Sequence, residues 1–294
     1  MPTETVYGLA ANALDQEAVW RIFDIKKRPS FDPLIVHIAG IEATERYVSD
    51  FPAPLRRLAG HFWPGPLTLL LPKKEIIPDI VTSGLDRVAL RVPAHPLAQE
   101  LLRLLDFPLA APSANPFGYI SPTTAQHVAD QLGADIPYIL DGGPCTVGVE
   151  STIIGWDNGQ VTVYRLGGMA VEAIEDIAGP VHIQLNQSSN PAAPGMLKSH
   201  YAPRKPLFLG DPEVLLPQLE GKRVGTISLQ ALPLPVAEQE ILSPSGDLQA
   251  AARQLFAALR ALDQSDVEVI VAQPLPDEGL GRAMNDRLRR AAAG

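Results

Sequence analysis

The chain has 294 residues, of which 46% are hydrophobic, and a formal net charge of -9 at pH 7. This length and composition suit roughly two globular domains with real cores. The acidic balance argues against a dedicated nucleic-acid-binding protein, which normally carries a basic surplus to meet phosphates, although it leaves a local basic patch open. Proline is abundant, with 29 residues, which predicts fixed turns rather than disorder.

The cysteine count and the hydropathy indicate the cellular compartment in which the protein is expected. One cysteine, Cys145, excludes a disulfide within this chain and a multi-cysteine metal site, and it suits a reducing cytosol. No signal peptide is visible, and no apolar run approaches the ~20 residues needed to span a membrane. We therefore expect a cytoplasmic globular protein without membrane contact.

Helix-like and strand-like segments alternate along the first part of the chain. Asp15 is placed to cap a helix whose apolar residues fall at helical spacing, and Ser121 followed by Pro122 is a good helix start. Strands are expected at 34–38, 67–71, 88–92, 151–154 and 161–166, and a helix at 171–177. The alternation predicts an α/β domain, with a mixed sheet because the last two strands are adjacent in the chain.

A polar, proline-containing stretch at 186–195 indicates a linker. Beyond it, strands are expected at 206–210, 223–229 and 267–272, and helices at 248–262 and 281–293. These segments predict a small doubly wound α/β unit. Its first strand is not followed by G-x-G-x-x-G, so nothing predicts a dinucleotide site there.

The opening segment, Pro2-Thr3-Glu4-Thr5-Val6-Tyr7-Gly8-Leu9, has the composition of a ligand-holding loop. Proline and glycine fix the backbone, while the two hydroxyls supply short hydrogen-bond partners. A strand end followed by a turn would have the same composition. The residues alone leave both interpretations open.

A basic cluster, Lys26-Lys27-Arg28, stands at the end of the first expected helix. Cations there complement the helix dipole, so a solvated helix end is one interpretation. The other is a phosphate clamp, which the forked guanidinium of Arg28 suits. Asp32 and His37 follow closely and favour the functional interpretation, but His37 alone is more often structural and has no partner at zinc-ligand spacing.

Three later segments also carry polar groups suited to ligands. Ser113 and Asn115 lie on one side of an extended 111–116 segment, which is no G-x-S-x-G elbow and could equally be a proline-rich turn. A glycine-rich loop at 142–152 can offer backbone N–H groups to an anion, but it is no Walker A motif. Arg165 ends a strand, and His200-Tyr201 stands in the interdomain segment, where a plain linker would not need aromatic residues.

Taken together, these segments resemble the YrdC/Sua5 family of threonylcarbamoyl-AMP synthases, in its long two-domain Sua5 form. The resemblance is carried by these segments, in chain order: 2–9, Lys26-Lys27-Arg28-Pro29, Pro33-Leu34-Ile35-Val36-His37, Trp63-Pro64-Gly65-Pro66-Leu67-Thr68, Arg91-Val92-Pro93, Ser113-Ala114-Asn115, Ser121-Pro122-Thr123, Glu150-Ser151-Thr152, Arg165-Leu166-Gly167, Gly195-Met196, His200-Tyr201-Ala202-Pro203, Leu275-Pro276, Gly279-Leu280-Gly281 and Asn285-Asp286-Arg287-Leu288. So many ordered matches make coincidence untenable.

The resemblance implies a YrdC-like catalytic domain over 1–182, with a twisted mixed sheet around a positively lined cavity. It further implies a linker over 183–205 that closes over the active site, and a Rossmann-like Sua5 domain over 206–294. The implied reaction condenses L-threonine, bicarbonate or CO2, and ATP into threonylcarbamoyl-adenylate, with release of pyrophosphate. The product would feed N6-threonylcarbamoylation of adenosine-37 in tRNA through a downstream transferase machinery, and the net charge does not support direct tRNA contact.

The resemblance also implies roles for individual residues. Those matching the family's basic and polar catalytic tetrad are Lys26, Arg28, Ser113 and Asn115. Those implied to hold threonine are Thr5, His37, Arg91, Ala111 through its backbone, and Ser151. Those implied to hold ATP are Arg28, Asp32, Arg87, Ser113, Ser121, Arg165 and Tyr201. Mg2+ would arrive on the ATP phosphates rather than on protein ligands, and catalysis would consist of positioning and charge stabilisation.

The chain departs from the family pattern in places. Asp32 stands where asparagine is usual, Arg87 where threonine is common, Lys27 at a frequent glycine and Phe117 at a frequent serine. A carboxylate at 32 would repel phosphate unless it is bridged by a metal or turned away, and Arg87 could add a phosphate contact that offsets it.

Family members also have a helix and a strand before the opening segment. We therefore expect either an upstream start codon or a destabilised chain with an unpaired sheet edge, and the intact mass of the native protein would decide.

Two other functions stay open from the sequence. One is a noncatalytic RNA-binding module, which the acidic net charge and the lack of a stacking aromatic platform disfavour. The other is a carbamoyl-adenylate transfer domain of the hydrogenase-maturation type, which normally lies within a larger chain and lacks the Sua5 extension.

Overall fold

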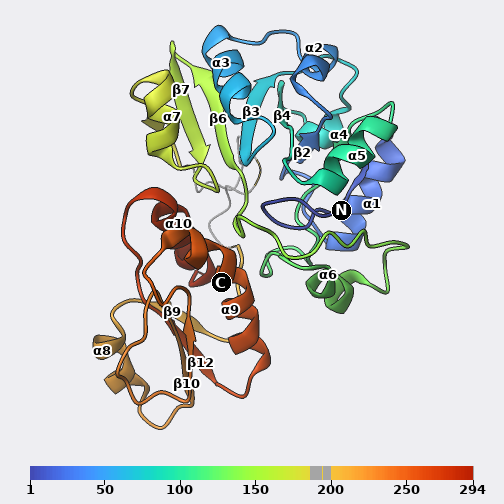
Figure 1. Ribbon diagram of the computed structural model, residues 1–294. Coiled ribbons are helices and arrows are strands. Elements are labelled where there is room, and N and C mark those ends of the chain that lie inside the picture. The colour runs from blue at the N-terminus through green and yellow to red at the C-terminus, as the bar shows by residue number, and fades with distance from the viewer. Residues whose placement is uncertain (186–193, 195–199, 294) are drawn as a thin grey trace.

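The computed structural model describes residues 1–185, 194 and 200–293, and most of the expected 186–195 linker lies outside the described residues. The helices and strands form two units, each built on its own sheet (Figure 1). The N-terminal unit carries eight strands and the C-terminal unit four, within the described part of the chain. Both units mix helices with strands, which confirms the predicted α/β class.

The N-terminal sheet is mixed, with the strand order β1-β5-β2-β4-β3-β6-β7-β8. Its strands are β1 (Ala11–Asn12), β2 (Ile35–His37), β3 (Leu67–Pro72), β4 (Arg87–Arg91), β5 (Leu109–Ala110), β6 (Thr152–Asp157), β7 (Gln160–Arg165) and β8 (His182–Ile183). Its helices are α1 (Gln16–Lys26), α2 (Thr44–Tyr47), α3 (Ala53–Phe62), α4 (Asp79–Thr82), α5 (Pro96–Leu104), α6 (Ala125–Leu132) and α7 (Val171–Ala178), with a 3-10 turn η1 (Ile41–Ala43).

The C-terminal sheet is parallel, with the strand order β11-β10-β12-β9. Its strands are β9 (Leu207–Leu209), β10 (Val224–Ser228), β11 (Glu238–Ile241) and β12 (Val269–Ala272). Its helices are α8 (Pro212–Leu215), α9 (Leu248–Gln264) and α10 (Gly279–Ala291), with a 3-10 turn η2 (Leu216–Leu219). The long helices α9 and α10 lie on the side of this unit that faces the N-terminal unit (Figure 1).

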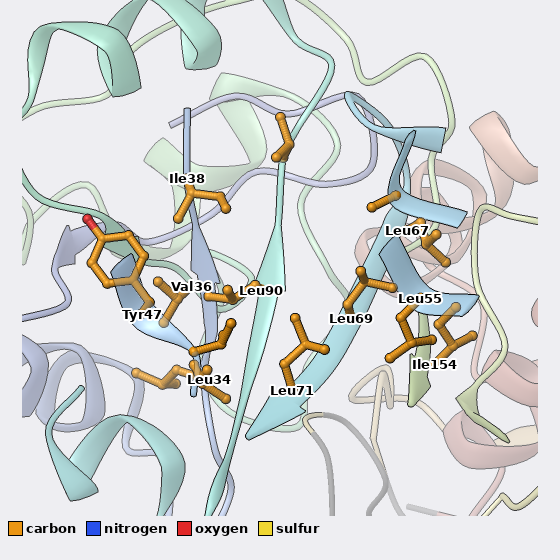
Figure 2. Close-up of a cluster of buried hydrophobic side chains, with 14 of the residues drawn as sticks. Leu34, Val36, Ile38, Tyr47, Leu55, Leu67, Leu69, Leu71, Leu90 and Ile154 are labelled. Carbon is orange, nitrogen blue, oxygen red and sulfur yellow. The ribbon is translucent and has the colours of Figure 1, made fainter. Parts of the chain in front are cut away.

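Alternation along the central strands separates a core face from a polar face in the N-terminal sheet. Figure 2 shows Val36, Leu69 and Leu90 within one apolar cluster. Because successive side chains of a strand point to opposite faces, their neighbours Ile35, His37 and Arg91 point away from this core. His37 and Arg91 therefore lie on the face of the sheet opposite this apolar core.

The expected helix start at Ser121-Pro122 is wrong. Helix α6 begins at Ala125, and the hydroxyl of Thr124 caps it by accepting a hydrogen bond from the backbone N–H of His127. Ser121 instead donates its hydroxyl to Glu150, 29 residues later in the chain. The Ser121 side chain, which local sequence preference assigns to a helix cap, is therefore engaged in a tertiary hydrogen bond with Glu150.

The two units share apolar packing across their boundary. One cluster joins Val6, Ile120 and Val149 of the N-terminal unit to residues of α9 and α10, including Phe256. Gly148, with φ +85°, packs closely against α9. A Cβ atom there would lie 2.4 Å from the Ala252 carbonyl oxygen and 2.4 Å from Arg253 Cα, both on α9.

This approach predicts that Gly148→Ala destabilises the protein more than Gly143→Ala does. Gly143 also has a positive φ, +78°, but an added Cβ there would meet nothing within 4 Å. Gly143→Ala should cost about 1–2 kcal/mol for the left-handed backbone alone, and Gly148→Ala a further ~1–3 kcal/mol for overpacking against α9. Denaturant unfolding of both variants measures this difference, and equal losses would contradict close packing at Gly148.

Candidate active site

A cavity of about 50 Å³ lies on the polar side of the N-terminal sheet. It is bounded by the opening loop, strands β2 and β4, the loops after β5 and before β6, the end of β7, and Pro194, His200 and Tyr201 of the expected 183–205 linker. The residues that line it are Thr3, Thr5, Val6, Gly8, Arg28, Pro33, Ile35, His37, Arg91, Ala111, Pro112, Ser113, Glu150, Ser151, Arg165, Pro194, His200 and Tyr201.

The opening loop forms one wall of the cavity, and hydrogen bonds from its threonine hydroxyls hold its conformation. Thr3 donates its hydroxyl to the Val6 carbonyl (2.6 Å), and its oxygen lies 2.9 Å from the Thr5 hydroxyl oxygen. The backbone N–H of Tyr7 donates to the Pro122 carbonyl at 2.9 Å, and that of Gly8 to the Met1 carbonyl at 2.9 Å. Thr5 is thereby held fully buried at the cavity wall.

Arg91 is a buried cation beside this loop. It donates to the Thr5 hydroxyl at 2.8 Å and to the Gly65 carbonyl at 3.2 Å, and it forms an ion pair with Glu4 at 2.6 Å. The parallel register of β2 and β4 sets His37 opposite Arg91. Burial, and then the charge of Arg91, lowers the pKa of His37 to about 3, so the imidazole is neutral at neutral pH.

Ser151 immediately precedes β6 and lies between two partners, Thr68 and Arg165. Its hydroxyl oxygen is 2.7 Å from that of Thr68 and accepts a hydrogen bond from Arg165 Nη2 at 3.1 Å. Arg165 also donates to the Ser151 carbonyl (2.8 Å) and to the Pro194 carbonyl (3.3 Å). Burial lowers the pKa of Arg165 to about 10, which leaves it cationic at neutral pH.

Lys26, at the end of α1, holds the loop that follows β5. Its Nζ donates to the Ser113 carbonyl (2.6 Å) and to the Asn115 carbonyl (2.5 Å). Burial, and then the charge of Arg28, lowers the pKa of Lys26 well below its usual value. Asn115 donates its side-chain amide to the carbonyls of Pro116 (2.8 Å) and Tyr119 (2.9 Å), which braces the same loop.

Arg28 and Asp32 form a buried ion pair of 2.8 Å. Arg28 also donates to the backbone carbonyls of Asp32 (3.0 Å) and Pro33 (2.8 Å). Arg28 lines the cavity and Asp32 does not. The carboxylate at position 32 is therefore neutralised by its own arginine instead of facing the cavity.

Glu150 joins the cavity to the C-terminal unit. One carboxylate oxygen accepts the Ser121 hydroxyl at 2.6 Å, and the other accepts Arg287 Nε of α10 at 2.7 Å. Burial by itself raises the pKa of Glu150, but the charges of Arg287 and Arg165 and the Ser121 hydrogen bond hold the pKa below its usual value. Glu150 is thus a buried carboxylate in its ionised form.

Tyr201 and His200 close the remaining side. Tyr201 has a left-handed backbone, φ 66°, and its ring stacks on Phe256 of α9 with centroids 5.7 Å apart. The guanidinium carbon of Arg287 lies 5.0 Å from the centroid of the same ring. His200 packs edge-on against Phe117 at 5.7 Å. Burial, and then nearby cations, lowers the pKa of His200 well below its usual value, so it is neutral.

The structure brings most of the predicted site residues to this cavity. Those that line it are Thr5, Arg28, His37, Arg91, Ala111, Ser113, Ser151, Arg165 and Tyr201. Those that contact a lining residue without lining it themselves are Lys26, Asp32 and Ser121. Asn115 lies one step further out, since its carbonyl accepts from Lys26.

Arg87 is placed differently. It lies at the start of β4, where its guanidinium pairs with Asp157 at 3.1 Å and with the Tyr164 hydroxyl at 3.2 Å. It is absent from the cavity lining. A phosphate contact for Arg87 stays a prediction.

Sequence reasoning assigned no role to Glu4, Glu150 or Arg287, although all three stand in the quoted motifs. Each is a buried charged group whose partner lies far along the chain: Glu4 and Arg91 are 87 positions apart, and Glu150 and Arg287 are 137 positions apart. A charged residue inside an otherwise apolar or small-residue motif is the signal that could have found them.

The charge balance of the cavity suits an anion. Three arginines and one glutamate line it, in a chain whose net charge is -9. Across the described residues, no group of three or more His, Cys, Asp or Glu side chains is arranged to hold a metal ion. The same part of the chain contains no helix long and apolar enough to cross a membrane.

Two family models match nearly the whole chain. The model for Sua5, YciO and YrdC proteins, described as "Telomere recombination", matches residues 1–167. The model described as "Threonylcarbamoyl-AMP synthase, C-terminal domain" matches residues 169–293.

Relatives that match over the full length of this chain are named threonylcarbamoyl-AMP synthase, as in the description of the second family model. The threonylcarbamoyl-AMP synthase of Pyrococcus abyssi is 43% identical over 306 residues, covering 99% of this chain and 89% of the relative. That of Bacillus subtilis is 42% identical over 307 residues, covering 100% and 88%. The crystal structure of P. abyssi Sua5 complexed with L-threonine superposes with a TM-score of 0.94 at 42% identity, covering 99% of this chain and 89% of that one. The chain belongs to the Sua5/YrdC family of threonylcarbamoyl-AMP synthases, in its two-domain form.

Proposed function

We propose that this protein is an L-threonylcarbamoyladenylate synthase, which condenses L-threonine, bicarbonate or CO2, and ATP with release of pyrophosphate. The observation that carries the proposal is the cavity in which Thr5, Arg91, Ser151 and Arg165 converge. It is supported by the full-length relatives of that name and by the solved relative complexed with L-threonine.

The reaction needs two bond-forming steps and no protein nucleophile. The threonine amine attacks the carbon of bicarbonate or CO2 to give an N-carboxylate. Water leaves when bicarbonate is the donor, and the amine nitrogen releases a proton to solvent when CO2 is the donor. An oxygen of this carbamate then attacks the α-phosphorus of ATP, and pyrophosphate leaves with the electron pair of the broken P–O bond. Both steps develop negative charge on oxygen, which fixed buried cations stabilise strongly.

The threonine end of the cavity is assigned to the opening loop and the adjoining strands. Arg91 supplies a counter-charge for the threonine carboxylate, since guanidinium–carboxylate pairs are strong and directional. Thr5 and Ser151 supply hydroxyl partners, and the neutral His37 can donate or accept without adding charge. The Ala111 backbone completes this end.

The nucleotide end is assigned to Arg28, Ser113, Arg165 and Tyr201, with Lys26 and Asn115 fixing the loop that carries Ser113. Asp32 is proposed to orient Arg28 through their ion pair. Mg2+ enters as part of the substrate, MgATP, and no protein-held metal is proposed. The adenylate would then pass to a downstream tRNA threonylcarbamoyl transferase machinery.

Pyrophosphate release from MgATP by the full chain tests the proposal. We expect release only when L-threonine and bicarbonate are both present. Release without threonine would reject the proposed substrate and favour a carbamoyl-adenylate transfer activity. Binding of tRNA without any turnover would favour an RNA-binding module instead.

Arg91→Met should raise the KM for L-threonine about 10- to 100-fold, the scale of losing a hydrogen bond to a charged group. The KM for ATP should change far less, because Arg91 is assigned to the threonine end. Steady-state kinetics with each substrate varied in turn measure both values. Arg56→Met, which removes the exposed ion pair with Glu45 and the contact of the guanidinium with the Phe51 ring, is the control and should match the wild type, because none of these residues lines the cavity. An unchanged threonine KM in Arg91→Met would contradict the assignment.

The low pKa of His37 predicts a stability loss in acid. Between pH ~6.5 and ~3 the unfolded chain binds a proton at His37 and the native chain does not, so this contribution is complete above pH 6.5 and declines as pH falls. His37 should add up to ~1.4 kcal/mol per pH unit to the slope of unfolding free energy within that window. Denaturant unfolding from pH 4 to 7 should show a shallower slope for His37→Gln, and identical slopes would indicate that native His37 takes up a proton normally.

A further inference from the structure

We propose that Arg287, on helix α10 of the C-terminal unit, is a positioning residue for the active site. It holds Glu150 and Tyr201 at the cavity from across the boundary between the two units. The C-terminal unit would thereby be a structural component of the catalytic site. The kinetic part of this inference rests on the proposed function.

One guanidinium makes all the contacts on which the inference depends. Arg287 is fully buried and donates to Glu150 Oε2 at 2.7 Å, to the Leu166 carbonyl at 2.9 Å and to its neighbour Asp286 at 2.6 Å. Its guanidinium carbon lies 5.0 Å from the centroid of the Tyr201 ring. Glu150 and Tyr201 line the cavity, whereas Arg287 does not. Arg287 therefore acts through other residues and not on the substrate.

These contacts lie next to the groups assigned to substrate. Glu150 immediately precedes Ser151, and Leu166 immediately follows Arg165. The other oxygen of Glu150 accepts the Ser121 hydroxyl, so a displaced Glu150 would move residues on two separate loops. Arg165 and Ser151 are joined by hydrogen bonds. Arg287 therefore contacts the chain neighbour of each member of this pair, Leu166 beside Arg165 and Glu150 beside Ser151.

The charge of Arg287 matters as well as its shape. The groups that act on Glu150 are Arg287 from α10, Arg165 from β7, the Ser121 hydroxyl, and Tyr201 from the segment before β9. Burial raises the pKa of Glu150, and Arg287 is the first of the groups that oppose it. Without Arg287 the carboxyl should take up a proton at higher pH and lose its role as a double acceptor.

A residue that merely joins the two units would behave differently. Helix α10 offers such a residue in Arg282, which pairs with Glu172 of α7 across the same boundary at 3.3 Å. Neither Arg282 nor Glu172 lines the cavity. Arg282→Met is therefore a matched control, because it removes an arginine ion pair between the same helix and the N-terminal unit.

The experiment compares the full-length wild type with Arg287→Met, Arg287→Lys and Arg282→Met. Threonine-dependent pyrophosphate release is followed from pH 4 to 9, so that the measured range extends to the low pH at which Glu150 takes up a proton in the wild type. The carboxyl pKa of Glu150 is read by 13C NMR on protein labelled at glutamate, with Glu150→Gln to assign the signal. Thermal unfolding reports whether each variant folds.

We expect Arg287→Met to lower kcat/KM about 100-fold at neutral pH, the scale of an ångström-level misplacement in an active site. The acid limb of its pH–rate profile, where the rate falls as the pH is lowered, should move to higher pH together with the pKa of Glu150. Arg287→Lys keeps the charge, so its acid limb should stay near that of the wild type while its rate falls less. Arg282→Met should keep the wild-type rate and profile.

Two results would overturn the inference. One is a folded Arg287→Met variant with the rate and acid limb of Arg282→Met. The other is an unchanged Glu150 pKa in Arg287→Met. If Arg287→Met fails to fold, the folded Arg287→Lys variant decides, because loss of the Leu166 contact alone should lower its rate while its acid limb is kept.

Failure of the proposed function would be recognised separately. The wild type itself would then release no pyrophosphate with threonine and bicarbonate. The 13C measurement needs no substrate, so the hold of Arg287 on Glu150 would still be accepted or rejected from that signal.

Discussion

The site depends on burying guanidinium groups, each of which must keep a partner for its charge. A buried cation without such a partner is strongly destabilising, whereas a paired and hydrogen-bonded one is tolerated. Arg28 has Asp32, Arg91 has Glu4 and Arg287 has Glu150, at 2.8, 2.6 and 2.7 Å. Arg165 is held instead by the Ser151 and Pro194 carbonyls. The guanidinium groups are therefore fixed in place by protein partners, and such preorganised donors suit reactions that develop negative charge on oxygen.

The same requirement explains why two units make one site. Glu150 lies on the N-terminal unit, while the arginine that neutralises it comes from α10. Tyr201 stacks on Phe256 of α9 while lining the cavity of the other unit. Apolar packing supports these polar contacts, because Val6, Ile120 and Val149 belong to the cluster that contains the α9 and α10 residues. Separation of the units would expose both a buried charge and an apolar surface.

Local patterns predicted the fold well where periodicity and burial agree. The strand prediction at 67–71 corresponds to β3 (Leu67–Pro72), and the helix prediction at 248–262 to α9 (Leu248–Gln264), because one is a continuous apolar run and the other a long amphipathic repeat. Ser121-Pro122 misled because the Ser121 hydroxyl is taken by Glu150. The Glu150–Arg287 pair could not be predicted, since 137 residues separate its members and no local pattern links them.

The departures from the family pattern become intelligible once pairing is considered. A carboxylate at 32 conflicts with phosphate binding only if it faces the ligand uncompensated, and here it pairs with Arg28 away from the cavity lining. The arginine at 87 has its own partners in Asp157 and Tyr164, on the strands β6 and β7. The two substitutions therefore act at separate places and need not offset one another. Charge at each position is balanced locally, by Arg28 for Asp32 and by Asp157 for Arg87, so neither departure removes an arginine from the cavity lining.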